Sequence, residues 1–209
     1  GQLLLFCCLG GLSASAVAAT CTTVGGGNYV VPAGPRTIPR DAPVGSTVIP
    51  KIGNSPGYTM NCQGDRNQDR DAYVTFKVAV APAPGYSDVY PTNLPGLGVK
   101  YHFSSNTPYG CGLPWDQGIP NANYTMVCHL PMGTTQTWVG GTSVEFIKTG
   151  PITAGSLTSI PSVTMSYALN NEPGTWSLTP MYAGGLTGSV SVPACTTPNV
   201  SVDMGKHKT

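Results

Sequence analysis

Charged side chains are scarce in this chain of 209 residues: Asp, Glu, Lys and Arg together make up 9% of it, against about a quarter in an average soluble domain. This scarcity argues against a coiled coil, a helical bundle and a charge-rich disordered tail. The net charge is +1, and no cluster of Lys and Arg is longer than a pair. Because nucleic-acid-binding proteins carry a basic patch, we expect no nucleic-acid partner.

Long apolar runs are also missing. The run at residues 3–9 is far shorter than the roughly 20 residues that a membrane-spanning helix needs. Small residues follow at 13–19, with an Ala-x-Ala-like cleavage site near Ala19. We therefore expect residues 1–19 to be the remnant of a secretory signal peptide whose start is missing, and we expect no membrane insertion.

Motifs for catalysis and metal binding are absent. None of the three histidines has the spacing of a metal site, and the sequence contains no nucleophile elbow, no P-loop and no dinucleotide-binding glycine motif. We expect neither an enzyme nor a metal or other cofactor, although a triad assembled from distant residues stays open. The strand patterns place His102 and His129 at solvent-facing positions.

Glycine and proline are plentiful, with 27 and 20 residues, and they separate short segments in which apolar residues alternate with polar ones. The longest of these segments carries Val74, Phe76, Val78 and Val80 on one face. Others lie at residues 46–52, 99–103, 124–130, 142–148, 163–169 and 189–192. Many short strands between turns predict an all-β sandwich or barrel. Trp138 and Trp176 are expected in its core.

Five cysteines remain after the expected signal segment, an odd number for an oxidising compartment. Four of them allow three pairings, and proximity along the chain favours Cys111–Cys128, which leaves Cys21–Cys62. We therefore expect two disulfides. The partner of Cys195 is expected beyond Thr209, with a free thiol or an intermolecular bridge as the alternatives.

A domain boundary is expected near residue 193. Val190 and Val192 are typical of a closing strand, and Val200 and Val202 of the first strand of a new unit. We therefore expect one domain at residues 20–193. Residues 194–209 are expected to form a linker and the start of a truncated second domain.

The most polar segment is residues 62–71. Asp65, Asn67, Asp69 and Asp71 fall at alternate positions, as the ligands of a calcium loop do, but Arg70 occupies the position that such a loop gives to glycine. A solvated loop with internal ion pairs is the simpler interpretation. The other is a ligand-binding loop, because paired donors and acceptors suit sugar hydroxyls.

A second candidate binding surface is the loop closed by the expected Cys111–Cys128 bridge. It contains Trp115 and is preceded by Tyr109, and rigid aromatic side chains are typical of recognition loops. The alternative is that Trp115 packs into the core beneath the loop.

Several strings of residues resemble one family. The chain is similar to bacterial chaperone–usher fimbrial tip adhesins at two cysteines and in three strings. These are Cys21 near the expected mature N-terminus, Cys62, IPRDAPVG at 38–45, GLGVKY at 96–101 and VEFIKTGPITAGSL at 144–157. Within that family the chain most resembles the type 3, MrkD-like adhesins, and more distantly the mannose-binding type 1 adhesin.

The resemblance implies an elongated, immunoglobulin-like β-sandwich of jelly-roll type that binds a receptor and is joined to a pilin domain. The pilin domain would begin near Cys195 and be completed by a strand from the next subunit. Partners would be a periplasmic chaperone, an usher and that subunit, and the protein would pass through the periplasm to the fimbrium tip. Cleavage after Ala19 leaves only Thr20 before Cys21, so the chain has no strand to donate, as expected at a tip.

The resemblance also implies binding residues at Thr20, in the 63–71 loop and at Asn170, Asn171 and Glu172. The mannose-binding relative has an aromatic residue where this chain has Thr20, and its loop differs at residues 63–65. The expected receptor is therefore another host glycan or an extracellular-matrix protein such as collagen, with which type 3 adhesins are associated. A non-binding tip or adaptor subunit and, more remotely, a secreted β-sandwich enzyme are the alternatives.

Overall fold

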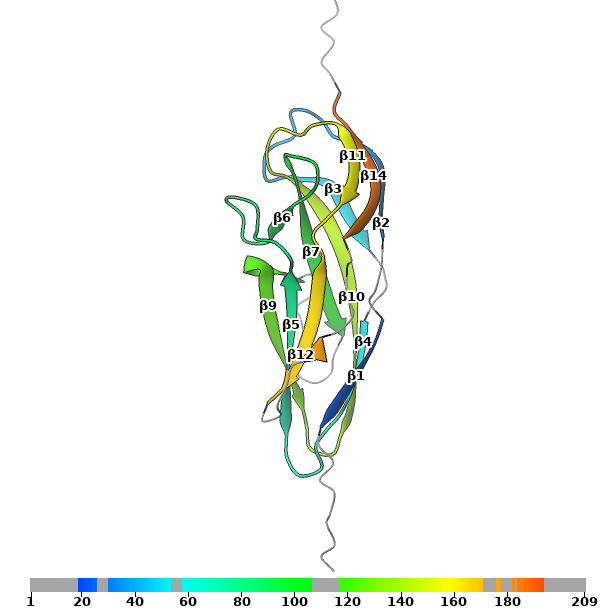
Figure 1. Ribbon diagram of the computed structural model, residues 1–209, viewed down its shortest axis with the longest axis vertical. Helices are drawn as coiled ribbons and strands as arrows, with labels where there is room; N and C mark the ends of the chain where they lie inside the picture. The colour runs from blue at the N-terminus through cyan, green and yellow to red at the C-terminus, as the bar shows by residue number, and fades with distance from the viewer. Residues whose placement is uncertain are drawn as a thin grey trace, which may run out of the picture.

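The computed structural model describes residues 19–25, 30–53, 58–106, 117–170, 176–177, 182 and 184–193. Across these ranges the fold is an all-β sandwich with one short 3-10 turn and no α-helix. The domain is elongated, and the described chain leaves it at one narrow end, beside β2, β11 and β14 (Figure 1). No helix in the described part is long and apolar enough to cross a membrane.

Three sheets make up the fold. The largest has the order β1-β4-β10-β7-β6, with β3 also paired to β10 and β8 to β7. Its strands are β1 (Thr20–Gly25), β3 (Thr47–Gly53), β4 (Tyr58–Gln63), β6 (Val89–Pro91), β7 (Leu97–Asn106), β8 (Gln117–Gly118) and β10 (Thr135–Lys148). The second has the order β13-β12-β5-β9, with β5 (Arg70–Val78), β9 (Asn123–Leu130), β12 (Val163–Leu169) and β13 (Trp176–Ser177). The third joins β11 (Gly155–Ser159), β14 (Gly185–Ser191) and β2 (Val31–Thr37).

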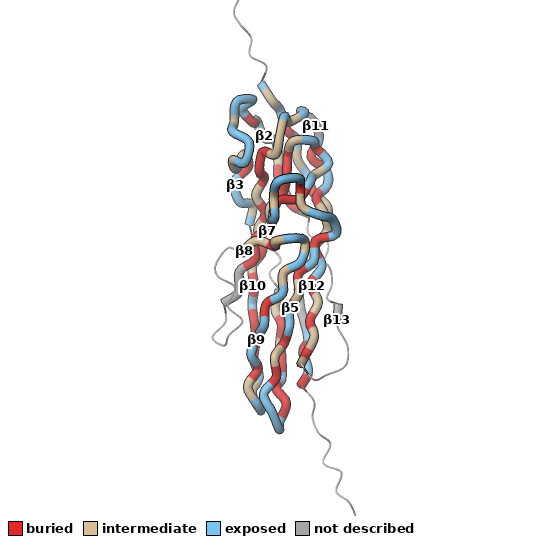
Figure 2. The backbone as a smooth tube through the Cα atoms, turned by 90° about the vertical axis from the view of Figure 1, so that its left-hand side faces the viewer, coloured by how far each residue is buried: buried red, intermediate tan, exposed pale blue. Residues whose placement is uncertain are grey.

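Buried residues of all three sheets form one core, and buried and exposed residues alternate along the strands (Figure 2). Phe76 of β5 meets Phe103 of β7 with ring centroids 4.4 Å apart, so these rings join the two layers. Trp138 of β10 is fully buried, as predicted. The predicted alternation on the three long strands is confirmed by burial of the following residues: Val74, Phe76, Val78, Val99, Tyr101, Phe103, Val163, Met165, Tyr167 and Leu169.

Two positions in these patterns were predicted wrongly. Val80 was expected in the core, but β5 ends at Val78 and the Val80 side chain is 40% exposed. His102 was expected at the surface and is buried, because β8 pairs with β7 at this position and Glu145 of β10 lies against the ring. The His102 Nε2 to Glu145 Oε1 distance is 2.9 Å, and burial lowers the pKa of His102 although the Glu145 carboxylate opposes this.

The strings at 96–101 and 144–157 lie side by side in the fold. Leu97 is opposite Lys148 and Val99 is opposite Phe146 in the β7–β10 ladder. Gly96 has a φ of +81°, and its carbonyl oxygen accepts a hydrogen bond of 2.8 Å from the Thr149 amide. The two strings thus form one close backbone contact in the large sheet.

The Cys21–Cys62 disulfide is confirmed: the two residues lie opposite one another on β1 and β4. Cys128 of β9 is also disulfide-bonded. Its predicted partner Cys111 lies outside the described residues, as does Cys195, so that second pairing stays a prediction.

Candidate functional site

Several loops meet at the end of the domain opposite the one where the chain leaves the fold after β14 (Figure 1). They are the 64–69 loop between β4 and β5, the 131–134 turn between β9 and β10, and the chain after β12. The registers place them together, because Leu130 pairs with Arg70 in one sheet and Thr20, Gln63 and Thr135 align in the other. We call this region the loop end.

A buried ion pair lies at the centre of the loop end. The Arg70 guanidinium donates to one Asp65 carboxylate oxygen from Nη2 at 2.8 Å and from Nε at 3.2 Å. Both residues are 5% exposed. The second Asp65 oxygen accepts from the Asn67 amide at 2.8 Å, and Arg70 Nη1 donates to the Asn170 carbonyl oxygen at 3.0 Å. The pair therefore connects the 64–69 loop to the end of β12.

Further hydrogen bonds attach the 131–134 turn and the end of β12 to the segment at residues 65–71. The Met132 amide donates to Asp69 Oδ1 at 2.8 Å, and the Gly133 amide donates to the Asp65 carbonyl at the same distance. Asn170 Oδ1 accepts from the Asp71 amide at 2.8 Å. Backbone and carboxylate contacts thus fix three segments relative to one another before any ligand binds.

These contacts also lower the pKa of the Asp65 carboxyl. The hydrogen bond from the Asn67 amide, followed by that from Arg70, lowers the pKa of the Asp65 carboxyl below its usual value, against a smaller opposing effect of burial. A carboxylate whose pKa is lower in the folded than in the unfolded chain adds stability above the unfolded pKa of about 3.9, and this contribution is lost as the pH falls through the folded value.

We predict that Asp65→Asn lowers the free energy of unfolding at pH 7 and makes this free energy depend less on pH. Urea unfolding at pH 7 and at pH 3 should show a smaller difference between the two conditions for this variant than for the parent chain. Asp41→Asn is the matched control, because Asp41 is exposed and forms no ion pair or hydrogen bond through its side chain within the described ranges. Equal acid dependence of Asp65→Asn and the parent chain would contradict the role given to Asp65.

The structure gives the predicted site residues different positions. Asp65 and Asn170 have oxygens engaged inside the protein, so they organise the loops in the described geometry. Asn67 and Asp69 are exposed on the 64–69 loop, although one Asp69 oxygen holds the Met132 amide. The remaining predicted site residues lie outside the described residues: Asn171, Glu172, Tyr109 and Trp115.

Three residues of the loop end were not among the predicted site residues. Arg70 shares the inward phase of Ala72 and Val74 on β5, and this phase was the signal that could have identified a buried arginine. His129 Nδ1 lies 3.0 Å from Asp71 Oδ1. Met132 is 52% exposed in the 131–134 turn, and only the turn residues Pro131 and Gly133 beside it marked its place.

The exposed groups combine charge, amide and apolar surface. Arg66, Asn67, Asp69, His129 and Met132 offer donors, acceptors and one apolar contact to a ligand on a fixed frame. Within the described residues, no group of three or more His, Cys, Asp or Glu could hold a metal ion. The arrangement therefore suits non-covalent binding of a polar partner.

A small pocket lies beside the start of β1. It has a volume of about 130 Å³ and is lined by Ala19, Thr20, Cys21, Tyr167 and Leu169. Pockets that enclose drug-sized ligands measure about 300–1,000 Å³, so this one holds at most a small part of a ligand. The Tyr167 hydroxyl donates to the Cys21 carbonyl at 2.6 Å, which fixes the wall of the pocket.

No model of a protein family matches the chain, and no curated protein matches it. Several solved structures do match the chain. The chain is similar to the receptor-binding domain of the plasmid-born adhesin MrkD1P of Klebsiella pneumoniae, with 18% identity, a TM-score of 0.46 and coverage of 86% of this chain and 99% of the other. It is also similar to the CupB6 tip adhesin of Pseudomonas aeruginosa, with 10% identity, a TM-score of 0.47 and coverage of 83% and 43%.

A third similar structure is the ambient temperature fimbriae adhesin AtfE of Proteus mirabilis, with 14% identity, a TM-score of 0.40 and coverage of 79% and 99%. The chain spans less than half of the CupB6 structure. Each of these three proteins is named as an adhesin.

Proposed function

We propose that residues 20–193 form the receptor-binding domain of a fimbrial tip adhesin, and that the loop end binds the receptor. The supporting observation is the set of segments held together by the buried Asp65–Arg70 pair, at the end of the sandwich opposite the exit of the chain after β14 (Figure 1). A subunit that attaches through its C-terminal side presents this end to a host surface. Binding loops fixed in advance lose less conformational entropy on association.

The proposed receptor is a host glycan or an extracellular-matrix protein such as collagen, and the protein binds it without catalysing a reaction. The proposed assembly partners are a periplasmic chaperone, an usher and the next pilus subunit, engaged through a pilin domain that begins in residues 194–209. Residues 1–19 would direct export to the periplasm. These proposals rest on the sequence strings at 38–45, 96–101 and 144–157.

The proposal is tested by binding the disulfide-bonded chain in parallel to a glycan array and to immobilised collagens and fibronectin. We expect saturable binding to one of these receptor classes. Binding to a single glycan class would identify a lectin, whereas binding to matrix protein alone would indicate a protein receptor. Absence of binding on both surfaces would overturn the receptor-binding proposal and favour a non-binding tip or adaptor subunit.

We predict that Asn67→Ala weakens receptor binding about tenfold while leaving the unfolding temperature unchanged. The Asn67 side chain is exposed and only its backbone amide bonds to Asp65, so its loss removes a contact to the receptor and none within the fold. Asn123→Ala, an exposed amide at the far end of β9, is the matched control. If the two alanine variants bind equally well, the receptor does not contact the 64–69 loop.

A further inference from the structure

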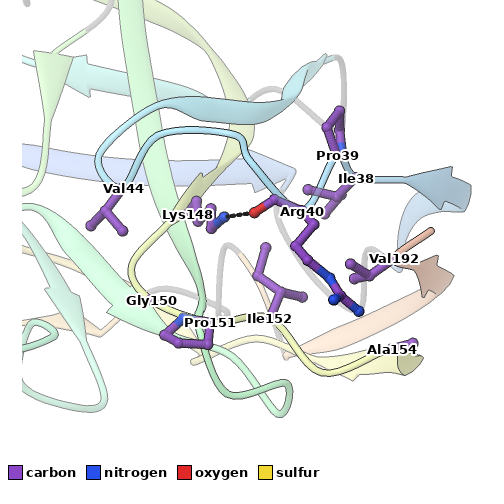
Figure 3. Close-up of a pocket in the computed structure, with 10 residues that line it drawn as sticks. All are labelled: Ile38, Pro39, Arg40, Val44, Lys148, Gly150, Pro151, Ile152, Ala154 and Val192. Carbon is purple, nitrogen blue, oxygen red and sulfur yellow. Dashed lines mark hydrogen bonds between the residues drawn. The ribbon is translucent and has the colours of Figure 1, made fainter. Parts of the chain in front are cut away.

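A pocket of about 610 Å³ lies at the end of the domain opposite the loop end, between the 38–44 loop, the 150–154 segment and the chain just after β14. Figure 3 shows its walls. Ile38, Val44, Ile152 and Val192 supply apolar surface. The volume is within the range of about 300–1,000 Å³ that is typical of small-molecule sites.

Two cations are part of this pocket. Arg40 extends its side chain between Ile152 and Val192, and its guanidinium makes no hydrogen bond or ion pair with any described residue (Figure 3). Lys148 is 8% exposed, and its ammonium donates one hydrogen bond of 2.7 Å, to the Arg40 carbonyl oxygen.

Among the residues that the structure describes, no acidic side chain balances these charges. The lining contains no Asp or Glu, and the neighbouring Asp41 is exposed and forms no ion pair with either cation. A buried ammonium that lacks a carboxylate partner is costly, and an anion that enters the pocket removes part of that cost. The charge of the pocket therefore favours an anionic ligand, and its apolar walls require that the ligand also carry an apolar body.

We propose that this pocket binds an amphiphilic monocarboxylate, an aliphatic chain that ends in a carboxylate. The carboxylate pairs with the Arg40 guanidinium and lies near the Lys148 ammonium. The aliphatic chain covers Ile38, Val44, Ile152 and Val192. This site lies at the opposite end from the loop end and does not depend on the proposed receptor binding.

The probe is sodium decanoate, titrated below its micelle concentration into the full chain with isotope-labelled methyl groups. We expect saturable shifts of the Ile38, Ile152 and Val192 methyl signals. Acetate, which lacks the chain, and decyltrimethylammonium, which has the opposite charge, should not produce them. Arg40→Gln should weaken decanoate binding at least about tenfold, because it removes a charge-assisted hydrogen bond. Arg66→Gln at the loop end is the matched control and should bind like the parent chain.

Val44→Ser gives a second variant that spares the fold, since Val44 is 62% exposed, and we expect it to weaken decanoate binding severalfold. Equal shifts with decanoate and decyltrimethylammonium would show detergent-like adsorption and overturn the proposal. So would equal affinity of Arg40→Gln and the parent chain, or no shift at millimolar decanoate. Contacts from residues 194–209 to the Ile152 methyl groups without ligand would assign the pocket to the chain itself, and would also overturn it.

Discussion

Gly96→Ala will lower the free energy of unfolding by about 3–5 kcal/mol, a loss at the upper end of what single substitutions cause. A Cβ at this position would overlap the carbonyl oxygen of Pro151, and both groups belong to backbone that cannot rotate away. The φ of +81° adds strain for any residue with a side chain. The clash falls where the 96–101 and 144–157 strings meet, so it separates β7 from the segment after β10.

Urea unfolding measures this loss, and Gly85→Ala is its matched control. Gly85 has nearly the same φ, +82°, but a Cβ there meets no atom within 4 Å. The control should therefore show only the conformational cost of a positive φ, about 1–2 kcal/mol. Equal losses in both variants would mean that the contact with Pro151 does not limit residue 96.

Removing the Cys21–Cys62 disulfide in a Cys21→Ala, Cys62→Ala double variant will lower the free energy of unfolding by about 2–5 kcal/mol. The bond attaches β1, an edge strand of the large sheet, to β4. Without it, β1 is held by its ladder to β4 and by the Tyr167 hydroxyl on the Cys21 carbonyl. We expect the amides of β1 to exchange with solvent earlier than those of β10.

Unfolding and amide exchange of the double variant should be compared with Thr22→Ala, an exposed substitution on the same strand that leaves the disulfide intact. The control should remain within about 0.5 kcal/mol of the parent chain. A double variant that is equally stable would show that the β1–β4 ladder alone fixes the start of the chain, and Thr20 with it.

The strands that face the core could be predicted because they alternate strictly. One apolar face is present on each of three segments, residues 74–78, 99–103 and 163–169. All three segments lie in long strands of the two larger sheets. β10 is longer than the predicted 142–148, because pairing with β4 extends it back to Thr135 through Gly140 and Gly141. β2 was not predicted, since Pro32 and Pro35 interrupt the pattern; it is an edge strand, where missing amide donors are tolerated.

The candidate site was only partly predictable, because side-chain type does not reveal which groups are already paired within the fold. Asp65 was predicted both as a ligand residue and as a member of an ion-paired loop. The structure shows the ion pair, buried and not solvated, with a partner five residues away. The bonds to Asn170 and Met132 join segments far apart in the sequence, so they could not be inferred from spacing.

The most direct test of the central claim, that the loop end binds the receptor, is an amide chemical-shift map. The isotope-labelled chain would be titrated with the receptor identified in the binding screen. We expect the largest shifts at residues 66–69 and 131–134, with the amides near Pro39 and Pro151 at the opposite end unchanged. A map in which the shifts cluster at that opposite end, while the amide signals of the loop end stay unchanged, would contradict the proposed orientation and the proposed function.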